Sequence, residues 1–296
     1  MSEHVRGVRR PRIAIAGATG RVGAALIANL AVDAVDIVAL TRNPKSTRLP
    51  AGVDTAEVNF DLASTLSSAL QGANRLFLAH GTSETQVANE IALIGAAVGA
   101  GVSHIAKLSA LGPPTRLHPF DWHMKIEAHL ATCDVGYTIL RPSCFVDVLA
   151  RAQAPVAQGT WGGTAGDGRV NLIDTRDIAD IARLALIDDQ FLNAQRAYHL
   201  TGPGTVSMPE IAIELSRLIG RPVTYQPRTE QEHRAVLIAS GVSEMVADLL
   251  LGLDRIFRDG VLAETTNTVI DLTGKKPRSV FEWLTDHLSS FETPNR

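Results

Sequence analysis

The sequence lacks the features that mark several classes of protein. Its 296 residues include two cysteines, Cys133 and Cys144, which are too few for a disulfide framework and have no second thiol at metal-binding spacing. A net charge of −3 gives no reason to expect binding to nucleic acid or to an anionic membrane. The longest uncharged apolar run, Ile91 to Val102, is too short to cross a bilayer. We therefore expect a protein of the reducing cytoplasm.

The basic segment at the start of the chain, MSEHVRGVRRPR, contains the pair Arg9 and Arg10. A twin-arginine export signal would also contain such a pair. The apolar run that follows, IAIAGATG, is short and lacks a pattern typical of a cleavage site. We interpret the segment as a solvated tail.

Short apolar runs alternate with helix-like segments over the first two-thirds of the chain. Strands are expected at Arg12–Gly17, Asp36–Thr41, Val53–Phe60, Arg75–His80, His104–Gly112 and Tyr137–Pro142. Helices are expected at Val22–Val32, Leu62–Leu70 and Glu84–Gly99. This alternation predicts right-handed crossovers, and nearly continuous apolar strands suit a sheet that is buried on both faces. The predicted fold class is therefore α/β, with a doubly wound parallel sheet.

A glycine-rich turn, IAIAGATGRVG, connects the first expected strand to the first expected helix. Gly17 permits the tight turn, Gly20 lets the backbone approach a pyrophosphate, and Gly23 allows close packing of helix and strand. Unpaired amides at the start of the helix would face the anion. In this context the pattern predicts a dinucleotide site of the Rossmann type, and a tight turn without a ligand is the alternative. The candidate binding residues are Gly17, Ala18, Thr19, Gly20, Arg21, Val22 and Gly23.

The end of the second expected strand indicates which nicotinamide dinucleotide binds. An acidic residue there would hold the ribose 2′-hydroxyl of NAD. In this sequence Asp36 stands at the opposite end, and the strand finishes with Thr41, Arg42 and Asn43. Arg42, with Lys45 nearby, can hold a 2′-phosphate. NADP is therefore favoured over NAD, with a solvated surface arginine as the alternative reading of Arg42.

The rhythm of the sequence changes from about Gly159. The glycine-rich loop WGGTAGDGR precedes an expected strand at Val170–Ile173, a helix opening near Asp177 and a strand ending at Gly202. Three helical segments, a short strand (Val223–Gln226) and a last helix within SVFEWLTDHLSSF follow. We expect a dinucleotide-binding domain over residues 10–158, continued by 168–202, and a smaller α/β lobe over 203–296. This lobe is expected to cover the substrate at the carboxyl ends of the strands, where open α/β sheets bind ligands.

Five motifs occur in a characteristic order: GATGRVG, TRNP, NFDL, LSALG and GYTILRPSCF. Together they resemble the NmrA-like NAD(P)-binding family of atypical short-chain dehydrogenase/reductases, which includes quinone reductases, triphenylmethane reductase and isoflavone reductase-like proteins. The resemblance runs from about Arg12 to Gly202 and continues loosely to DLTGKKPRSVFEWL. It implies an NAD(P)H-dependent oxidoreductase that passes a hydride to a conjugated acceptor such as a quinone, and it leaves a homodimer open. A non-catalytic regulator that senses NAD(P), as the family's namesake does, is the alternative.

The resemblance also implies further residues around the cofactor. On the nicotinamide side these are the residues that close the fourth and sixth expected strands. Asp61 and Leu62 match the family's adenine-side contact. Asp147 stands where family members often have asparagine. The nicotinamide-side residues are Ala79, His80, Gly81, Pro142, Ser143, Cys144 and Phe145.

The usual catalytic pair of short-chain dehydrogenases, a tyrosine followed four residues later by a lysine, is absent. The three tyrosines, Tyr137, Tyr198 and Tyr225, are followed at that distance by arginine, glycine and threonine. This absence disfavours a sugar-nucleotide epimerase. It also means that another residue must supply or position a proton during hydride chemistry.

The segment DWHMKIEAHL offers such a residue. In the isoflavone-reductase branch a functional lysine lies on the helix before the sixth strand, and the resemblance puts His123 at its position. Glu127 follows one helical turn later, so its carboxylate can reach or orient the imidazole. His129 lies roughly 240° around the helix from His123, and no HExxH motif is present, so we expect no metal. His123 is the predicted proton donor, and a histidine hydrogen-bonded beneath the lobe is the alternative.

Ser109 is the remaining catalytic candidate. It ends the fifth expected strand, where the superfamily keeps a site serine, and a strand-end cap is the equally weighted alternative. A serine hydrolase is not predicted, because LSALG lacks the GxSxG elbow.

Overall fold

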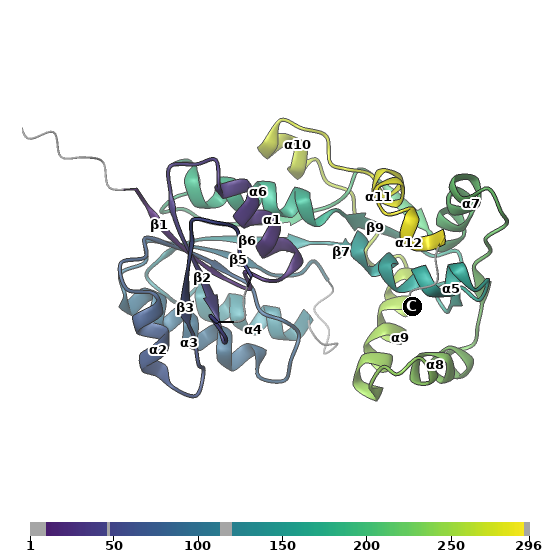
Figure 1. Cartoon of the computed structure of the whole chain (residues 1–296), viewed down its shortest axis with the longest axis horizontal. Helices are drawn as coiled ribbons and strands as arrows, with labels where there is room; N and C mark the ends of the chain where they lie inside the picture. Colours follow the sequence, from purple (N-terminus) through teal and green to yellow (C-terminus); the bar gives the residue numbers. More distant parts are fainter. Residues whose placement is uncertain (1–9, 46–47, 113–119, 293–296) are drawn as a thin grey trace, which may run out of the picture. The chain divides into compact units, whose positions relative to one another are not determined.

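The computed structural model describes residues 10–45, 48–112 and 120–292 (Figure 1). The chain forms two compact units and passes between them several times. The first unit comprises residues 1–109, 122–140 and 179–197, and the second comprises 110–121, 141–178 and 198–296. That residues 203–296 cover a substrate stays a prediction.

The first unit is built on a seven-stranded sheet. Its strands follow the order β10-β6-β5-β4-β1-β2-β3, and the pairings of β1 with β2 and β4, of β5 with β4 and β6, and of β2 with β3 are parallel. This order confirms the predicted doubly wound α/β fold. The strand order reverses at β1, since β2 and β3 follow on one side of it and β4, β5 and β6 on the other, which makes the carboxyl ends of β1 and β4 the topological switch point. The strands are β1 (Arg12–Ala16), β2 (Asp36–Thr41), β3 (Val53–Glu57), β4 (Arg75–Leu78), β5 (His104–Leu108), β6 (Gly136–Pro142) and β10 (Gln195–Leu200).

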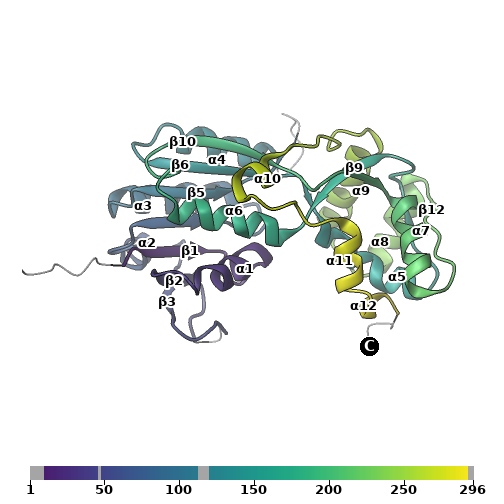
Figure 2. The ribbon, with the colours of Figure 1, turned by 90° about the horizontal axis from the view of Figure 1, so that it is seen from above.

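Helices cover both faces of this sheet. Helices α1 (Arg21–Leu30) and α6 (Thr175–Ile187) lie on one face, and α2 (Ala63–Ala69), α3 (Gln86–Gly99) and α4 (Phe120–Leu130) lie on the other (Figures 1 and 2). Burial on both sides explains why β1 and β2 are almost wholly apolar, whereas the edge strand β3 is largely exposed. The core beneath α2, α3 and α4 includes Leu66, Ala69, Leu93, Ile94, Ala97, Ile126 and Leu130.

The predicted strand at Val53–Phe60 is wrong at its end. The strand stops at Glu57, and Asn59 begins a turn in which its side chain accepts a hydrogen bond from the Asp61 amide at 3.0 Å. The Asn59 amide in turn donates to Thr65 Oγ1 at 2.9 Å. Asparagine competes for backbone donors in this way, so it ends the strand although Val58 and Phe60 are apolar.

The second unit combines two small sheets with helices. The strand orders are β11-β9-β7 and β12-β8. The 3₁₀ helix η1 and helix α5 were not expected from the sequence, and the short strand expected at Val223–Gln226 lies instead at Gln226–Pro227. The elements are β7 (Cys144–Phe145), η1 (Val146–Ala152), α5 (Gln153–Ala157), β8 (Gly162–Gly163), β9 (Arg169–Ile173), β11 (Thr205–Ser207), α7 (Met208–Ile219), β12 (Gln226–Pro227), α8 (Glu230–Ala239), α9 (Glu244–Arg258), α10 (Thr268–Thr273), α11 (Val280–Asp286) and α12 (Ser289–Glu292).

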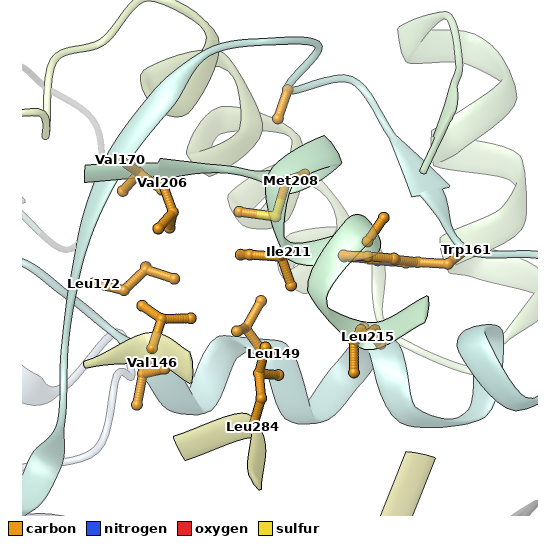
Figure 3. Packing of buried hydrophobic residues seen from close by; sticks show 14 of the residues in the cluster. Val146, Leu149, Trp161, Val170, Leu172, Val206, Met208, Ile211, Leu215 and Leu284 are labelled. Atoms are coloured by element: carbon orange, nitrogen blue, oxygen red, sulfur yellow. The ribbon is translucent and has the colours of Figure 1, made fainter. Parts of the chain in front are cut away.

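The second unit has its own apolar core (Figure 3). Helix α7 begins with a capping box formed by Ser207 and Glu210, and it ends at Gly220, whose φ of 75° suits glycine. It contacts β11 and α11, and its buried residues share one apolar cluster with residues of β9 and η1. The residues labelled in Figure 3 are Val146, Leu149, Trp161, Val170, Leu172, Val206, Met208, Ile211, Leu215 and Leu284.

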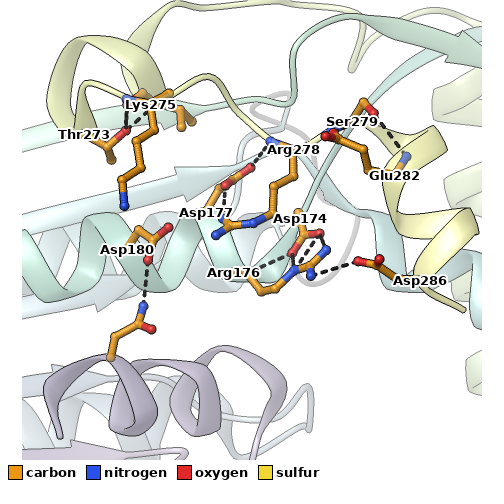
Figure 4. Close-up of polar contacts among 12 residues, drawn as sticks. Asp174, Arg176, Asp177, Asp180, Thr273, Lys275, Arg278, Ser279, Glu282 and Asp286 are labelled. Atoms are coloured by element: carbon orange, nitrogen blue, oxygen red, sulfur yellow. Dashed lines mark hydrogen bonds and ion pairs between the residues drawn. The ribbon is translucent and has the colours of Figure 1, made fainter. Parts of the chain in front are cut away.

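Ion pairs fasten the C-terminal segment to the start of α6 within this unit (Figure 4). The Arg278 amide donates to Asp177 Oδ2 at 2.8 Å, and its guanidinium pairs with the same carboxylate. Arg176 joins Asp174 at 2.6 Å to Asp286 at 3.0 Å. Across residues 10–45, 48–112 and 120–292, none of the helices is both long and apolar enough to pass through a membrane.

Candidate active site

The glycine-rich turn lies between β1 and α1, as the sequence predicts. Gly17 has a φ of 74°, and its carbonyl accepts a hydrogen bond from the Gly20 amide at 2.9 Å. Gly20 caps α1 in an extended conformation without a side-chain hydrogen bond. The first amides of α1 therefore have no side-chain cap from Gly20, which is the arrangement that binds anions at helix starts.

The backbone around this turn is too close for side chains. A Cβ on Gly23 would lie 2.2 Å from the carbonyl oxygen of Gly17. A Cβ on Gly17 would lie 3.0 Å from the carbonyl oxygen of Ala79, in a backbone conformation that disfavours other residues. The turn thus presents bare backbone amides to a ligand, and this fits the pyrophosphate of a dinucleotide.

A pocket of about 680 Å³ opens beside the turn, at the carboxyl ends of β1, β2 and β4. This volume lies in the range that holds small molecules and cofactors, and the location is the switch point of the sheet. Of the predicted cofactor residues, Gly17, Ala18, Thr19, Gly20, Arg42, Ala79, His80 and Gly81 line it. The sequence analysis did not predict cofactor contacts for the other lining residues, which include Thr41, Asn43, Phe60, Thr82, Ser83, Thr85, Asn89 and Glu90.

Other predicted cofactor residues lie outside the lining of this pocket. Arg21, Val22 and Gly23 form the first turn of α1, while Asp61 and Leu62 are exposed beyond β3. Pro142, Ser143, Cys144 and Phe145 belong to the second unit, in which the Ser143 amide donates to Leu200 and β7 pairs with β9. A role of these residues in cofactor binding stays a prediction.

His80 forms part of the pocket wall in a fixed orientation. Its Nδ1 lies 2.6 Å from the carbonyl oxygen of Gly81, and its Nε2 lies 3.1 Å from the amide nitrogen of Asn89. Because a carbonyl can only accept, Nδ1 carries the hydrogen and Nε2 accepts from Asn89. The ring packs edge-on to Phe60 with 5.8 Å between centroids. Two aromatic rings in contact with each other therefore line the pocket, from the segments that follow β4 and β3.

A buried ion pair adjoins the pocket through Glu90, one of its lining residues, and the sequence analysis missed it. Lys107 on β5 and Glu90 on α3 have side chains 0% and 1% exposed, with Nζ and Oε2 2.8 Å apart. Gln86, one turn before Glu90, donates to the other carboxylate oxygen at 2.9 Å. The available signal was a lysine within a strand expected to be buried on both faces, since buried lysines are rarely unpaired.

His123 contacts this ion pair. Its Nδ1 lies 3.2 Å from Lys107 Nζ, which also donates to the carbonyl oxygen of Leu108. Burial, and then the charge of Lys107, lower the pKa of the His123 imidazole to about 3. The imidazole is therefore neutral near pH 7 and can act as a hydrogen-bond donor without carrying a charge.

The other two predicted catalytic residues pair with each other. The Ser109 hydroxyl, at the end of β5, donates to the Glu127 carboxylate on α4. The charge of Glu127 also acts on Lys107, where it raises the pKa that burial lowers. His129 lies elsewhere on α4, with Nε2 4.0 Å from Cys133 Sγ. Within the described ranges, no group of histidine, cysteine, aspartate and glutamate side chains has the arrangement of a metal site.

The doubly wound sheet and its glycine-rich turn place the chain among the dinucleotide-binding α/β proteins. Within that class it belongs to the NmrA-like family, whose model matches residues 9–284. This match confirms the resemblance carried by the five sequence motifs.

Two curated relatives align with nearly the whole chain. The NAD(P)H azoreductase of Xenophilus azovorans is 31% identical over 284 residues, which cover 94% of this chain and 99% of the relative. Quinone oxidoreductase 2 of Escherichia coli (strain K12) is 33% identical over 277 residues, which cover 91% of this chain and 96% of the relative.

Solved structures show the same architecture. The NADPH complex of the Escherichia coli NADPH-dependent quinone oxidoreductase superposes with a TM-score of 0.84 at 30% identity, covering 93% of this chain and 99% of that one. The Citrobacter sp. triphenylmethane reductase complexed with NADP(H) superposes with a TM-score of 0.85 at 25% identity, with the same coverage of both chains, 93% and 99%.

Proposed function

We propose that this protein is an NADPH-dependent oxidoreductase that transfers a hydride to a conjugated acceptor such as a quinone. One observation carries the proposal. Glu90 lines the dinucleotide pocket and pairs with Lys107, and Lys107 contacts His123, so a cofactor site and a candidate proton donor share one buried network. The names of the relatives, an azoreductase and a quinone oxidoreductase, support acceptors of the quinone type.

The charges around the pocket support NADPH over NADH. Arg42 lines the pocket at the end of β2, where Thr41 and Asn43 are its neighbours. Among the described lining residues Glu90 is the sole acid, and it comes from α3 rather than from β2. No carboxylate from the end of β2 is thus in place to hold a ribose 2′-hydroxyl, whereas the guanidinium of Arg42 can hold a 2′-phosphate through paired hydrogen bonds.

We assign the proton donation to His123. When bound, reduced nicotinamide supplies the hydride. The neutral imidazole of His123 donates a hydrogen bond, and then a proton, to the acceptor oxygen on which negative charge develops. The paired Ser109 and Glu127 hold their side chains at the end of β5 beside Lys107, and we retain both as site residues.

Location and assembly belong to the same proposal. We propose a cytoplasmic protein that acts on a small aromatic molecule, because a reducing compartment suits a chain whose cysteines are unpaired. A homodimer is the assembly that we propose. Sedimentation of the purified protein checks the assembly directly.

The proposed function is tested with the purified protein, NADPH and a panel of quinones. We expect the NADPH absorbance to fall only when a quinone is present, and NADPH to bind more tightly than NADH in calorimetry. Tight NADPH binding without reduction of any quinone, azo dye or triphenylmethane dye would overturn the catalytic assignment. The alternative of an NAD(P)-sensing regulator would then be supported.

A further inference from the structure

Lys107 is a buried lysine within strand β5, and its ammonium group lies beside three groups that it can contact as a donor. Strand β5 lies between β4 and β6, and the Lys107 side chain is 0% exposed. An ammonium group has three N–H donors and no acceptor. The three atoms near Nζ are Glu90 Oε2 at 2.8 Å, the carbonyl oxygen of Leu108 and His123 Nδ1 at 3.2 Å.

This geometry determines which nitrogen of His123 carries its hydrogen. The ion pair with the carboxylate of Glu90 keeps Lys107 in its ammonium form, and an ammonium group can donate a hydrogen bond but cannot accept one. Lys107 must therefore donate to Nδ1 of His123, which is the unprotonated nitrogen of the imidazole. The hydrogen of the neutral ring is then on Nε2, and the ring is neutral because its pKa is lowered to about 3 by burial and by Lys107.

We propose that Lys107 is a positioning residue that fixes His123 as the Nε2–H tautomer and returns a proton to Nδ1 when Nε2 gives one up. The second half of this proposal rests on the proposed function, because it assumes that Nε2 protonates a reduced acceptor. The first half, the tautomer, holds for the protein without any ligand.

The proton transfer balances without an external acid. A quinone that has gained a hydride carries negative charge on one oxygen, the Nε2–H bond breaks, and an O–H bond forms at that oxygen. At the same time an Nζ–H bond of Lys107 breaks and an Nδ1–H bond forms. The imidazole stays neutral with its hydrogen moved to Nδ1, the amine of Lys107 is left neutral beside the Glu90 carboxylate, and a proton from water later restores it. Without Lys107, loss of the Nε2 proton would turn the ring into an imidazolate anion. That anion is strongly basic, so the neutral ring would be a much weaker proton donor.

The groups around Lys107 suit a lysine that gives up a proton and regains it. Burial lowers the pKa of Lys107, while Glu90 on α3 and Glu127 on α4 raise it again. Those carboxylates and the imidazole of His123 are the titratable groups that face Lys107 among the described residues. Gln86 holds the second oxygen of Glu90, so the carboxylate stays in place through both protonation states of the lysine.

Nuclear magnetic resonance of the full-length protein without ligand tests the tautomer. Histidine side chains are labelled with ¹⁵N, and the signals of His123 among the nine histidines are assigned by their loss in His123→Gln. We expect an unprotonated, hydrogen-bonded Nδ1 and a protonated Nε2 that remain unchanged from pH 8 down to about pH 5. A protonated Nδ1 in the wild-type protein would overturn the proposal whether or not the protein reduces quinones.

A paired substitution removes the donor without leaving a buried charge. Lys107→Met combined with Glu90→Gln replaces the ion pair by neutral side chains of similar size, which avoids the large cost of an unpaired carboxylate. We expect the Nδ1 signal to move to that of a nitrogen without a hydrogen bond, or to average between tautomers. Turnover with quinone should fall roughly tenfold to a hundredfold, with the quinone KM little changed. An unchanged Nδ1 signal and unchanged turnover would contradict both halves of the proposal.

A second substitution separates positioning from proton supply. In Lys107→Arg the guanidinium can still donate to Nδ1 but cannot be deprotonated in a protein. We expect Lys107→Arg to keep the wild-type tautomer of His123 and to have a turnover as low as that of the paired variant. Turnover equal to wild type would contradict the claim that Lys107 supplies a proton to Nδ1. Lys125→Met on the exposed side of α4 is the matched control, and it should leave both the spectrum and turnover as in wild type. Thermal melting of every variant verifies that it is folded.

Discussion

The two units of this chain each contain buried carboxylates, but they neutralise them with different cations. In the second unit Asp174 and Asp177, each 3% exposed, are met by Arg176 and Arg278, whose side chains are 42% and 35% exposed. In the first unit Glu90 is met by Lys107, and both side chains are almost wholly buried. The arginines reach the carboxylates from solvent, whereas the lysine side chain is itself buried.

This difference separates a structural contact from one that suits chemistry. Arginine is always charged and binds a carboxylate with a planar set of donors, so the arginine pairs hold residues 278–286 against the start of α6. Lysine shifts its pKa readily when buried, and here its third donor reaches a histidine. We therefore expect substitutions in the first unit to change turnover and substitutions in the second to change stability.

The largest effect is expected at His123. His123→Ala should lower the turnover number roughly a hundredfold to ten-thousandfold, because it removes the group that donates a proton to the acceptor. NADPH affinity should change little, since the phosphate loop binds the dinucleotide independently of His123. Steady-state kinetics and calorimetry measure the two quantities, and turnover equal to wild type would refute the role of His123 as proton donor.

Arg278→Ala tests the other side of the comparison. Removing this guanidinium leaves the buried carboxylate of Asp177 without its ion-pair partner, so we expect a loss of about 3 kcal/mol in the free energy of unfolding. Urea unfolding measures this loss. A matched variant, Arg278→Ala with Asp177→Asn, should recover much of the stability because no buried charge remains. Failure to recover would mean that the contact depends on shape rather than on charge.

The sequence predicts some parts of the first unit and misses others. The glycine turn and the alternating strands could be predicted because their signals lie within a few consecutive residues, such as Gly17 to Gly23. The pairing of Lys107 with Glu90 joins a strand to a helix, and no local pattern indicates it. His123 was found only through family resemblance, and the expectation that Glu127 orients it did not anticipate the contact between Glu127 and Ser109.

The second unit was harder to predict for a different reason. Its strands β8 and β12 are two residues long, and η1 and α5 follow one another over Val146–Ala157 without a regular apolar period. Such elements form because distant segments meet, as when β9 pairs with β11 in an antiparallel direction. By contrast α7 carries its own local start and stop signals, Ser207 and Gly220, although the sequence analysis gave this helix no bounds.

As the pH falls, the stability of the first unit should decline at pH values at which His123 of the folded protein is still neutral. The folded-state pKa of His123 is about 3, whereas a free histidine side chain has a pKa of 6.5, so the unfolded chain takes up a proton between these values and the folded chain does not. The stability that this neutral imidazole contributes is therefore complete above pH 6.5 and declines as the pH falls toward 3, by on the order of 2 kcal/mol for a group that is not fully buried. Urea unfolding at pH 7 and pH 4 should show a smaller decline in His123→Gln than in wild type. Equal declines would mean that His123 is not held neutral.

Cofactor choice should depend on Arg42. Arg42→Asp replaces the guanidinium with a carboxylate that repels a 2′-phosphate and can accept from a ribose 2′-hydroxyl. We expect NADPH affinity to fall roughly tenfold and NADH affinity to rise, because one charge-assisted hydrogen-bond pair is exchanged for another. Calorimetric titration of both dinucleotides measures the change. Equal affinities of the wild-type protein for NADPH and NADH would contradict the assignment of Arg42.

The smallest effect is expected at His129, on the same helix as His123. Its imidazole lies near Cys133 and not near Lys107, so it has no part in the network that begins at Glu90. His129→Ala should therefore match wild type in turnover and in NADPH affinity, within the error of the assay. A chelator should also leave turnover unchanged, because the proposed chemistry uses no metal. If His129→Ala lowered turnover as much as His123→Ala, proton donation could not be assigned to the face of α4 that meets β5.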